Sequence, residues 1–175
     1  MHAQQVLEQT PRQGPRVLRP ATGPASATRP GITPTDRLIT KLVYWQRFPG
    51  AKYLVSPLLR AFGVNIPPAV PIGRDLRLPH CTTGLVLHPT TRVGARVTIF
   101  HNVTIGRADF QGPTGEFAGV TLEDDVLIGA GAAVLHRGSQ PLTIGKRSVV
   151  GANTVLTHSI GPGEVWAGNP ARRLR

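Results

Sequence analysis

The sequence predicts an all-β solenoid, in which one short strand and turn are repeated many times. An aliphatic residue recurs about every six positions, which fits neither the 3.6-residue period of a helix nor the alternation of a single strand. Repeats of six residues are typical of a parallel β-helix. A Val- and Gly-rich sandwich is the alternative, but sandwich strands do not keep one phase over so many positions. The repeated positions are Ile66, Ile72, Leu78, Leu85, Val93, Ile99, Ile105, Leu122, Ile128, Val134, Ile144, Val150 and Leu156.

Composition agrees with this fold class. Hydrophobic residues make up 40% of the chain and aromatic residues only 5%, which suits a narrow interior stacked with Val, Ile, Leu and Ala. A second set of small or apolar residues follows the repeated aliphatic position by four residues. Its members are Val70, Leu76, Val97, Val103, Val126, Ala132, Ser148, Thr154 and Ile160.

Residues 1–34 are expected to be a disordered, basic, Pro-rich tail, because six prolines and scattered polar residues leave little to bury. The net charge of the chain is +11, and residues 1–62 hold nine Lys and Arg against two acids. No interleaving of basic and aromatic residues predicts a nucleic-acid site. We therefore expect attraction to anionic small molecules or lipid head groups.

Residues 35–62 predict a short helical segment. Thr35 and Asp36 can cap a first helix that ends near Phe48, and residues 51–62 form the second helix, which Pro57 can kink. We expect these helices to pack on the solenoid end or on a neighbouring subunit. Peripheral membrane contact through residues 35–62 is the alternative, because Lys and Arg flank the apolar residues. The residues expected to group on one side of the first helix are Leu38, Ile39, Leu42, Val43 and Trp45. The second helix carries Leu54, Val55, Leu58, Leu59 and Phe62.

The repeats also predict which residues stack on one another. Starting from Leu78, spacings of seven, eight and six residues make one three-sided coil of 21 residues that ends at Ile99. His80 and His101, each two residues later, should therefore share a corner, one coil apart. The same column continues with Ala130 and Ala152, and a second column holds Arg107, His136 and His158.

One long insertion interrupts the period. Seventeen residues separate Ile105 from Leu122 where six are needed, so residues 107–121 are predicted to leave the coil as a loop. Long loops on a rigid scaffold often carry function. A smaller bulge is expected near residues 136–141.

Three stretches resemble the hexapeptide-repeat acyltransferases: residues 66–106, LEDDVLIGAGAAVL and the closing WAGNPARRL. The nearest members are serine acetyltransferase-like enzymes, including those that O-acetylate sugars in polysaccharide synthesis. The resemblance implies a left-handed parallel β-helix over residues 63–164 and a CoA-contacting tail at 165–175. It also implies a homotrimer that binds acetyl-CoA between subunits and uses a histidine as general base.

Carried over by position, the resemblance places the catalytic base at His80, because an imidazole can take and return a proton near neutral pH. Asn65 stands where serine acetyltransferases have the acidic partner of that histidine. Ala130 and Ala152 match the small residues beside the pantetheine arm of CoA. Arg172 matches a basic residue near the CoA phosphates.

Other positions depart from the family. Pro79 replaces an aspartate, and Ala118 with Gly119 replaces an Arg-His pair that meets the amino-acid substrate, so serine is the less expected acceptor. A sugar, glycan intermediate or other hydroxylated metabolite is expected instead. The predicted acceptor contacts are His101, together with Asp109 and Glu116, either of which can supply the missing acid from a neighbour's loop.

Two other classes stay open. A carbonic-anhydrase-like zinc enzyme could use His80 and His101, although the close H-x4-H pair of that family is absent, and no metal is expected. A non-catalytic scaffold would use the coils as structure only. One cysteine, Cys81, allows no internal disulfide, and the first residues lack an apolar signal segment, so a cytoplasmic location is expected.

Overall fold

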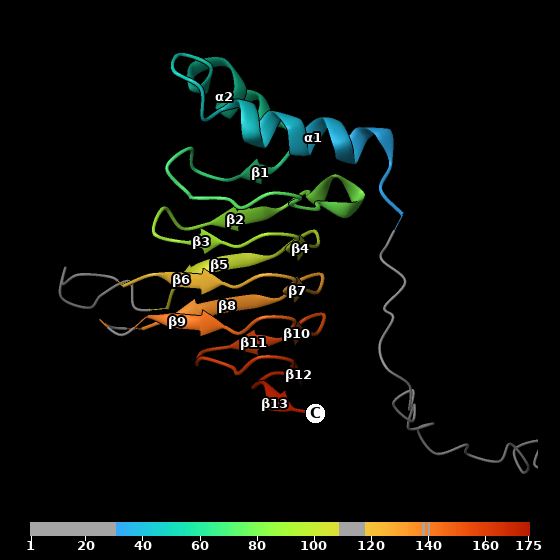
Figure 1. The fold of residues 1–175 in the computed structure, drawn as a ribbon, viewed down its shortest axis with the longest axis vertical. Coiled ribbons are helices and arrows are strands. Elements are labelled where there is room, and N and C mark those ends of the chain that lie inside the picture. The colour runs from blue at the N-terminus through green and yellow to red at the C-terminus, as the bar shows by residue number, and fades with distance from the viewer. Residues whose placement is uncertain (1–30, 109–117, 138, 140) are drawn as a thin grey trace, which may run out of the picture.

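The computed structural model describes residues 31–108, 118–137, 139 and 141–175. Within these residues, the chain visits three parallel sheets in turn. It adds one strand to each sheet as it moves down the stack (Figure 1). The first sheet contains β1 (Val64–Asn65), β2 (Leu85–Leu87), β5 (Thr104–Arg107), β8 (Ala133–His136) and β11 (Val155–Leu156). The second contains β3 (Arg92–Val93), β6 (Val120–Leu122) and β9 (Leu142–Ile144), and the third contains β4 (Thr98–Ile99), β7 (Leu127–Ile128), β10 (Val149–Val150), β12 (Val165–Ala167) and β13 (Arg172–Arg173).

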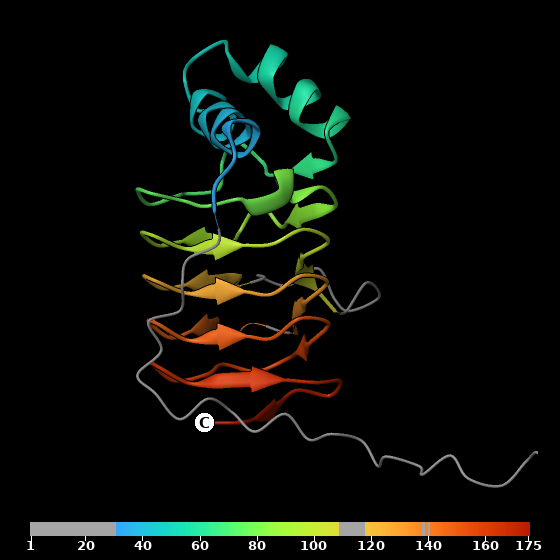
Figure 2. The same ribbon diagram turned by 90° about the vertical axis from the view of Figure 1, so that its right-hand side faces the viewer.

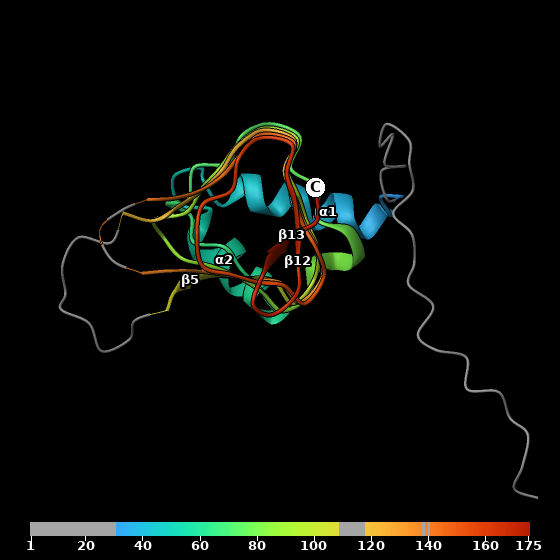
Figure 3. The ribbon, with the colours of Figure 1, turned by 90° about the horizontal axis from the view of Figure 1, so that it is seen from below.

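The strand register confirms the predicted coil length. Val64 pairs with Leu85, and Arg77 pairs with Thr98, so each pair is separated by 21 residues. Seen along the stack, the coils lie over one another with a three-sided outline (Figure 3). Only β13 runs antiparallel to its neighbour, β12.

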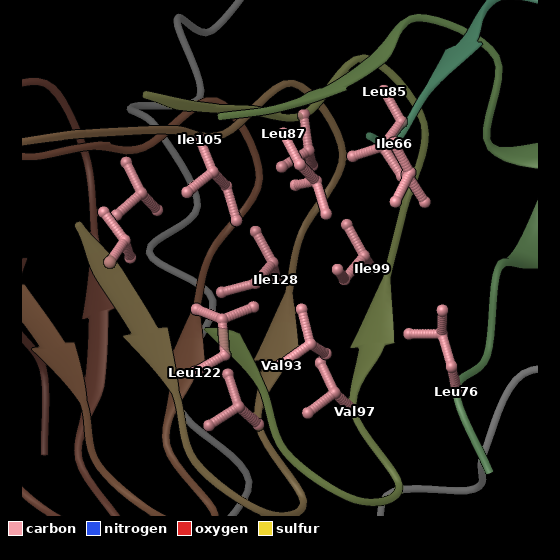
Figure 4. Packing of buried hydrophobic residues seen from close by; sticks show 14 of the residues in the cluster. Ile66, Leu76, Leu85, Leu87, Val93, Val97, Ile99, Ile105, Leu122 and Ile128 are labelled. Atoms are coloured by element: carbon pink, nitrogen blue, oxygen red, sulfur yellow. The ribbon is translucent and has the colours of Figure 1, made fainter. Parts of the chain in front are cut away.

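The repeated aliphatic positions form the core. All thirteen are buried, as are all nine residues that follow them by four. Figure 4 shows side chains from successive coils pointing into this interior. Each fully buried Val, Leu or Ile side chain contributes about 1.5–3 kcal/mol by leaving water, so the six-residue period sets both the register and the stability of the stack.

Glycine follows the aliphatic residue where two coils approach closely. A Cβ atom on Gly73 would lie 2.5 Å from the carbonyl carbon of Gly94 in the next coil, and one on Gly129 would lie 2.5 Å from the backbone nitrogen of Ala152. Any side chain at these positions would force neighbouring coils apart.

The two N-terminal helices cover the open end of the first coil (Figure 2). α1 (Pro34–Trp45) and α2 (Lys52–Ala61) lie above β1 and the turn η1 (Pro79–Thr82). Side chains of α1 and the residues after it donate to carbonyls that have no coil above them: Tyr44 to Gly73 at 2.6 Å, Gln46 to Ile66 at 3.0 Å and Arg47 to Ile72 at 3.2 Å. These bonds satisfy backbone groups that would otherwise be left unpaired.

The helices differ in detail from the prediction. α1 begins at Pro34 and is capped by Thr33, not Thr35, because Thr33 and Asp36 form a reciprocal capping box. Only Ile39 and Val43 of its apolar residues are buried, whereas Leu38 and Trp45 are 54% and 60% exposed. In α2, Val55 and Leu59 are buried, and Leu54, Leu58 and Phe62 are exposed. Full burial is therefore confined to Ile39 and Val43 among the apolar residues expected on one side of the first helix. None of the helices in the described ranges is long and apolar enough to cross a bilayer.

The long insertion lies within the predicted range, residues 107–121. Arg107 belongs to β5 and pairs with His136, and both Val120 and Thr121 belong to β6. Residues 109–117, which include Asp109 and Glu116, lie outside the described residues.

Candidate functional site

The candidate site is built on η1, the turn between the third and first sheets in the uppermost full coil. This turn carries His80, the predicted catalytic base, whose side chain is exposed. Three successive residues have positive φ angles, 57° at His80, 55° at Cys81 and 46° at Thr82. Each non-glycine residue in the left-handed region costs roughly 1–2 kcal/mol, so this turn must be held by its surroundings.

Two anchors hold the turn. On one side, the buried hydroxyl of Thr82 donates to the carbonyl oxygens of Pro79 at 3.1 Å and Ile99 at 3.3 Å. On the other side, the backbone N–H of Cys81 donates to Oδ1 of Asp36 at 2.6 Å. His80 directly precedes these two anchored residues, and its side chain is exposed.

The predicted histidine column is confirmed. The ring of His80 lies 5.9 Å from the ring of His101, edge to face, and 6.1 Å from the ring of Phe100. His101 is partly buried, and its Nδ1 atom is buried with no hydrogen-bond partner among the described residues. The corner therefore presents one exposed imidazole beside a second imidazole that has unused hydrogen-bonding capacity.

In the coils that follow His101, small residues occupy the same corner. Ile99 pairs with Ile128, and Ile128 with Val150, which places Ala130 and Ala152 at the same corner in successive coils. Backbone bonds fix this stack: Gly131 donates to the carbonyl of His101 at 3.0 Å, and Asn153 donates to that of Ala130 at 2.8 Å. Ala130 is partly buried and Ala152 is exposed, so the corner below His101 carries only methyl groups. A flat or extended ligand can lie along such a surface.

Two other predicted residues lie farther from the histidines. Asn65 is exposed on β1, where it pairs with Val86, and no hydrogen bond joins it to His80 among the bonds of the described chain. Arg172 is exposed on β13, at the far end of the stack. Both roles stay predictions.

Cys81 is a poor nucleophile. Burial raises the pKa of its thiol, and the neighbouring Asp36 carboxylate raises it further. The thiol is therefore protonated at neutral pH, and only the thiolate is an effective nucleophile. Its partly buried side chain packs against the hydrophobic core instead.

Three other histidines lie in the described residues, and one of them is buried. His136 is only 5% exposed and pairs with Arg107 of β5. His158 is exposed and packs edge to face against Trp166 at 4.7 Å. His88 is partly buried, and burial together with the charge of Arg107 lowers the pKa of His88.

Asp36 is the site residue that sequence reasoning missed. It was interpreted only as a helix cap, and 45 residues separate it from Cys81. No motif or repeat connects the two positions. The only signal was that a capping aspartate preceded a segment expected to pack on the solenoid end.

Known proteins share this repeat. Residues 114–136 and 119–158 match the family model described as the hexapeptide repeat of succinyl-transferase. The chain carries the hexapeptide repeat of the transferases.

Relatives of this hexapeptide-repeat chain are named serine acetyltransferases. It is 38% identical over 132 residues to the enzyme of Mycobacterium tuberculosis, covering 73% of this chain and 53% of that protein. It is 27% identical over 186 residues to that of Escherichia coli, covering 96% of this chain and 65% of that protein. Soybean serine acetyltransferase complexed with serine matches the structure with a TM-score of 0.61 and 33% identity, over 80% of this chain and 54% of that one. The predicted resemblance is thus confirmed, and the hexapeptide-repeat chain spans about half to two thirds of the length of these relatives.

Proposed function

We propose that the protein is an acetyl-CoA-dependent O-acetyltransferase, with a left-handed parallel β-helix as its scaffold and the cytoplasm as its location. The observation that carries the proposal is the corner column, in which an exposed histidine in a braced turn stands beside His101 and above Ala130 and Ala152. The names of the relatives support acetyl transfer as the reaction.

His80 acts as the general base in this proposal. Its imidazole takes the proton of the acceptor hydroxyl while that oxygen attacks the thioester carbonyl of acetyl-CoA. The tetrahedral oxyanion is stabilised by backbone N–H donors of the corner. When it collapses, the carbon–sulfur bond breaks, and the imidazolium returns its proton to the leaving thiolate, so the products are an acetyl ester and CoA.

Acetyl-CoA lies along the small-residue column in this proposal. The methyl groups of Ala130 and Ala152 leave space for the pantetheine arm, and the exposed guanidinium of Arg172 attracts phosphate groups. The column ends at His80 and His101, so the thioester would reach the histidines from the side of Ala130.

The acceptor is a small molecule that carries a hydroxyl group. Serine is the acceptor to which the names of the relatives point, and one soybean structure was determined with serine bound. Asn65, Pro79, Ala118 and Gly119 replace charged residues of the family motif, and these replacements favour a sugar or another neutral hydroxyl compound.

A turnover assay tests the reaction and the acceptor together. The purified protein is mixed with acetyl-CoA and either L-serine or a panel of sugars and nucleotide sugars, and release of free CoA thiol is followed. We expect acceptor-dependent release that survives treatment with a chelator. Release abolished by the chelator and restored by zinc would favour a metal enzyme instead. A protein that neither binds nor turns over acetyl-CoA would be a scaffold.

We further propose that the active unit is a homotrimer with sites between subunits. The surface of the single chain has two hollows. The lining of one, of about 360 Å³, includes Arg92 and Glu123. The lining of the other, of about 670 Å³, includes Arg47 and Tyr53. They lie away from the His80 corner, which is open in one chain. A neighbouring subunit would supply the missing wall, and the insertion after Arg107 is the segment proposed to reach it.

Mixed trimers test this arrangement. Chains that lack residues 109–117 are co-expressed with His80→Ala chains, and mixed assemblies are purified on two tags. If the insertion serves a neighbour's histidine, mixed trimers regain part of the activity that both parents lack. Activity no greater than that of the parents would show that the insertion serves its own chain or no site.

A further inference from the structure

Asp36 makes a contact that a helix cap does not require. It lies in the first turn of α1 and is 1% exposed. One carboxylate oxygen, Oδ2, accepts the N–H of Thr33 at 2.9 Å and completes the capping box. The other, Oδ1, accepts the N–H of Cys81 at 2.6 Å. This second bond leaves the helix and ends on the turn that carries His80.

A buried charge at this position needs a reason. No Lys, Arg or His of the described ranges forms an ion pair with Asp36, so its carboxylate is stabilised by hydrogen bonds from Thr33 and Cys81 and by the positive end of the helix dipole. Removing a carboxylate from water is costly. A neutral glutamine would complete the capping box without that cost, and neither capping bond uses Oδ1. The bond to Cys81 accounts for the carboxylate.

The turn also needs a support on this side. His80, Cys81 and Thr82 adopt left-handed backbone angles in succession, and Thr82 is tied to the coil below through Ile99. Without a partner for the Cys81 N–H, the turn would be held at one end only, and the direction of the His80 ring would vary.

We propose that Asp36 is a positioning residue, which fixes the direction of the His80 ring by holding the adjacent N–H of Cys81. The inference rests on the proposed role of His80 as the base. It assigns to helix α1 a part in catalysis besides covering the end of the coils.

The hydrogen bond between the N–H of Cys81 and the carboxylate of Asp36 is kept at neutral pH. Burial works to raise the pKa of Asp36, but hydrogen bonds from the N–H groups of Cys81 and Thr33 outweigh it, and the pKa lies below its ordinary value. The stabilising contact is therefore fully present above the ordinary pKa of an aspartate. It is lost only as the pH falls through the lowered pKa of the folded protein.

Three substitutions separate positioning from simple stabilisation. Asp36→Ala removes both carboxylate bonds, and we expect kcat to fall by about ten- to a hundredfold, the cost of a misdirected catalytic group, with the KM for acetyl-CoA unchanged. Asp36→Asn keeps an oxygen for Cys81 and should retain most of kcat. Thr33→Ala is the matched control, because it weakens the same capping box and leaves the bond to Cys81. It should lower the melting temperature and leave kcat unchanged.

Cys81 supplies two readouts that do not depend on turnover. Its backbone amide should exchange with deuterium faster in Asp36→Ala than in the wild type or in Thr33→Ala. Its thiol should be alkylated faster in Asp36→Asn, because loss of the carboxylate charge removes one cause of its raised pKa.

The outcomes are distinct. Normal kcat in Asp36→Ala, an unchanged exchange rate at Cys81, or an equal loss of kcat in Thr33→Ala would each overturn the positioning role. If instead the wild type transfers acetyl to no acceptor while exchange at Cys81 rises as expected in Asp36→Ala, the proposed function fails and the support of the turn stands.

Discussion

Replacing His80 with alanine should lower acetyl transfer by about 10²–10⁴-fold, the usual effect of losing a general base. The side chain is exposed, and its ring lies beside the rings of Phe100 and His101, so the coils should remain folded. Initial rates at saturating acetyl-CoA, with circular dichroism as the check on folding, give the result.

Two further variants make this result specific. His80→Asn also removes the base, but asparagine tolerates the left-handed backbone at this position better than alanine does, so it should be equally inactive and at least as stable. His88→Ala is the control, because this partly buried histidine lies just beyond the far end of β2, at the next corner of the coil. Near-normal turnover in folded His80→Asn would move the base elsewhere, with His101 the next residue to test.

Ala130→Trp should weaken CoA binding by about tenfold or more, because an indole would fill the narrow part of the corner column where the pantetheine arm is proposed to lie. The side chain points outward from a corner and is only partly buried, so the substitution should not open the core. Calorimetric titration with CoA measures the loss directly.

The repeat itself offers a matched control. Ala95 follows Val93 and Gly94 as Ala130 follows Ile128 and Gly129, and both alanines are partly buried. Ala95 stands at a different corner, where its N–H donates to Asp124. Ala95→Trp should therefore leave CoA affinity unchanged. Equal loss in both variants, or no loss in either, would show that the groove does not follow the alanine column.

Much of this fold could be predicted because a solenoid is nearly one-dimensional. Once the six-residue period is known, every aliphatic position and every coil neighbour follows, and His80 and His101 were placed together by counting alone. Each coil pairs with the next coil along the chain, so no long-range choice of partners remains open.

The features that escaped prediction lie outside that period. Helical periodicity showed which residues share a face, but not that Leu38 and Trp45 would face solvent while Ile39 and Val43 face the coils. That choice depends on how α1 docks. The bond between Asp36 and Cys81 depends on the same docking, and no repeat relates the two residues.

The backbone of η1 was also unpredictable. Nothing in the residues Pro79 to Thr82 indicates three left-handed residues in succession, because neither Cys nor Thr favours that region. The conformation is imposed by Thr82, Ile99 and Asp36, which come from three separate parts of the chain.

In the proposed reaction, an acetyl group passes from CoA to an acceptor hydroxyl at the His80 corner. Mass spectrometry of the acceptor tests it most directly, after incubation of serine or a sugar with acetyl-CoA carrying a labelled acetyl group. We predict one acceptor that gains the labelled acetyl ester with the wild-type protein and with His88→Ala, and not with His80→Asn. Labelled product formed equally well by folded His80→Asn would contradict the claim.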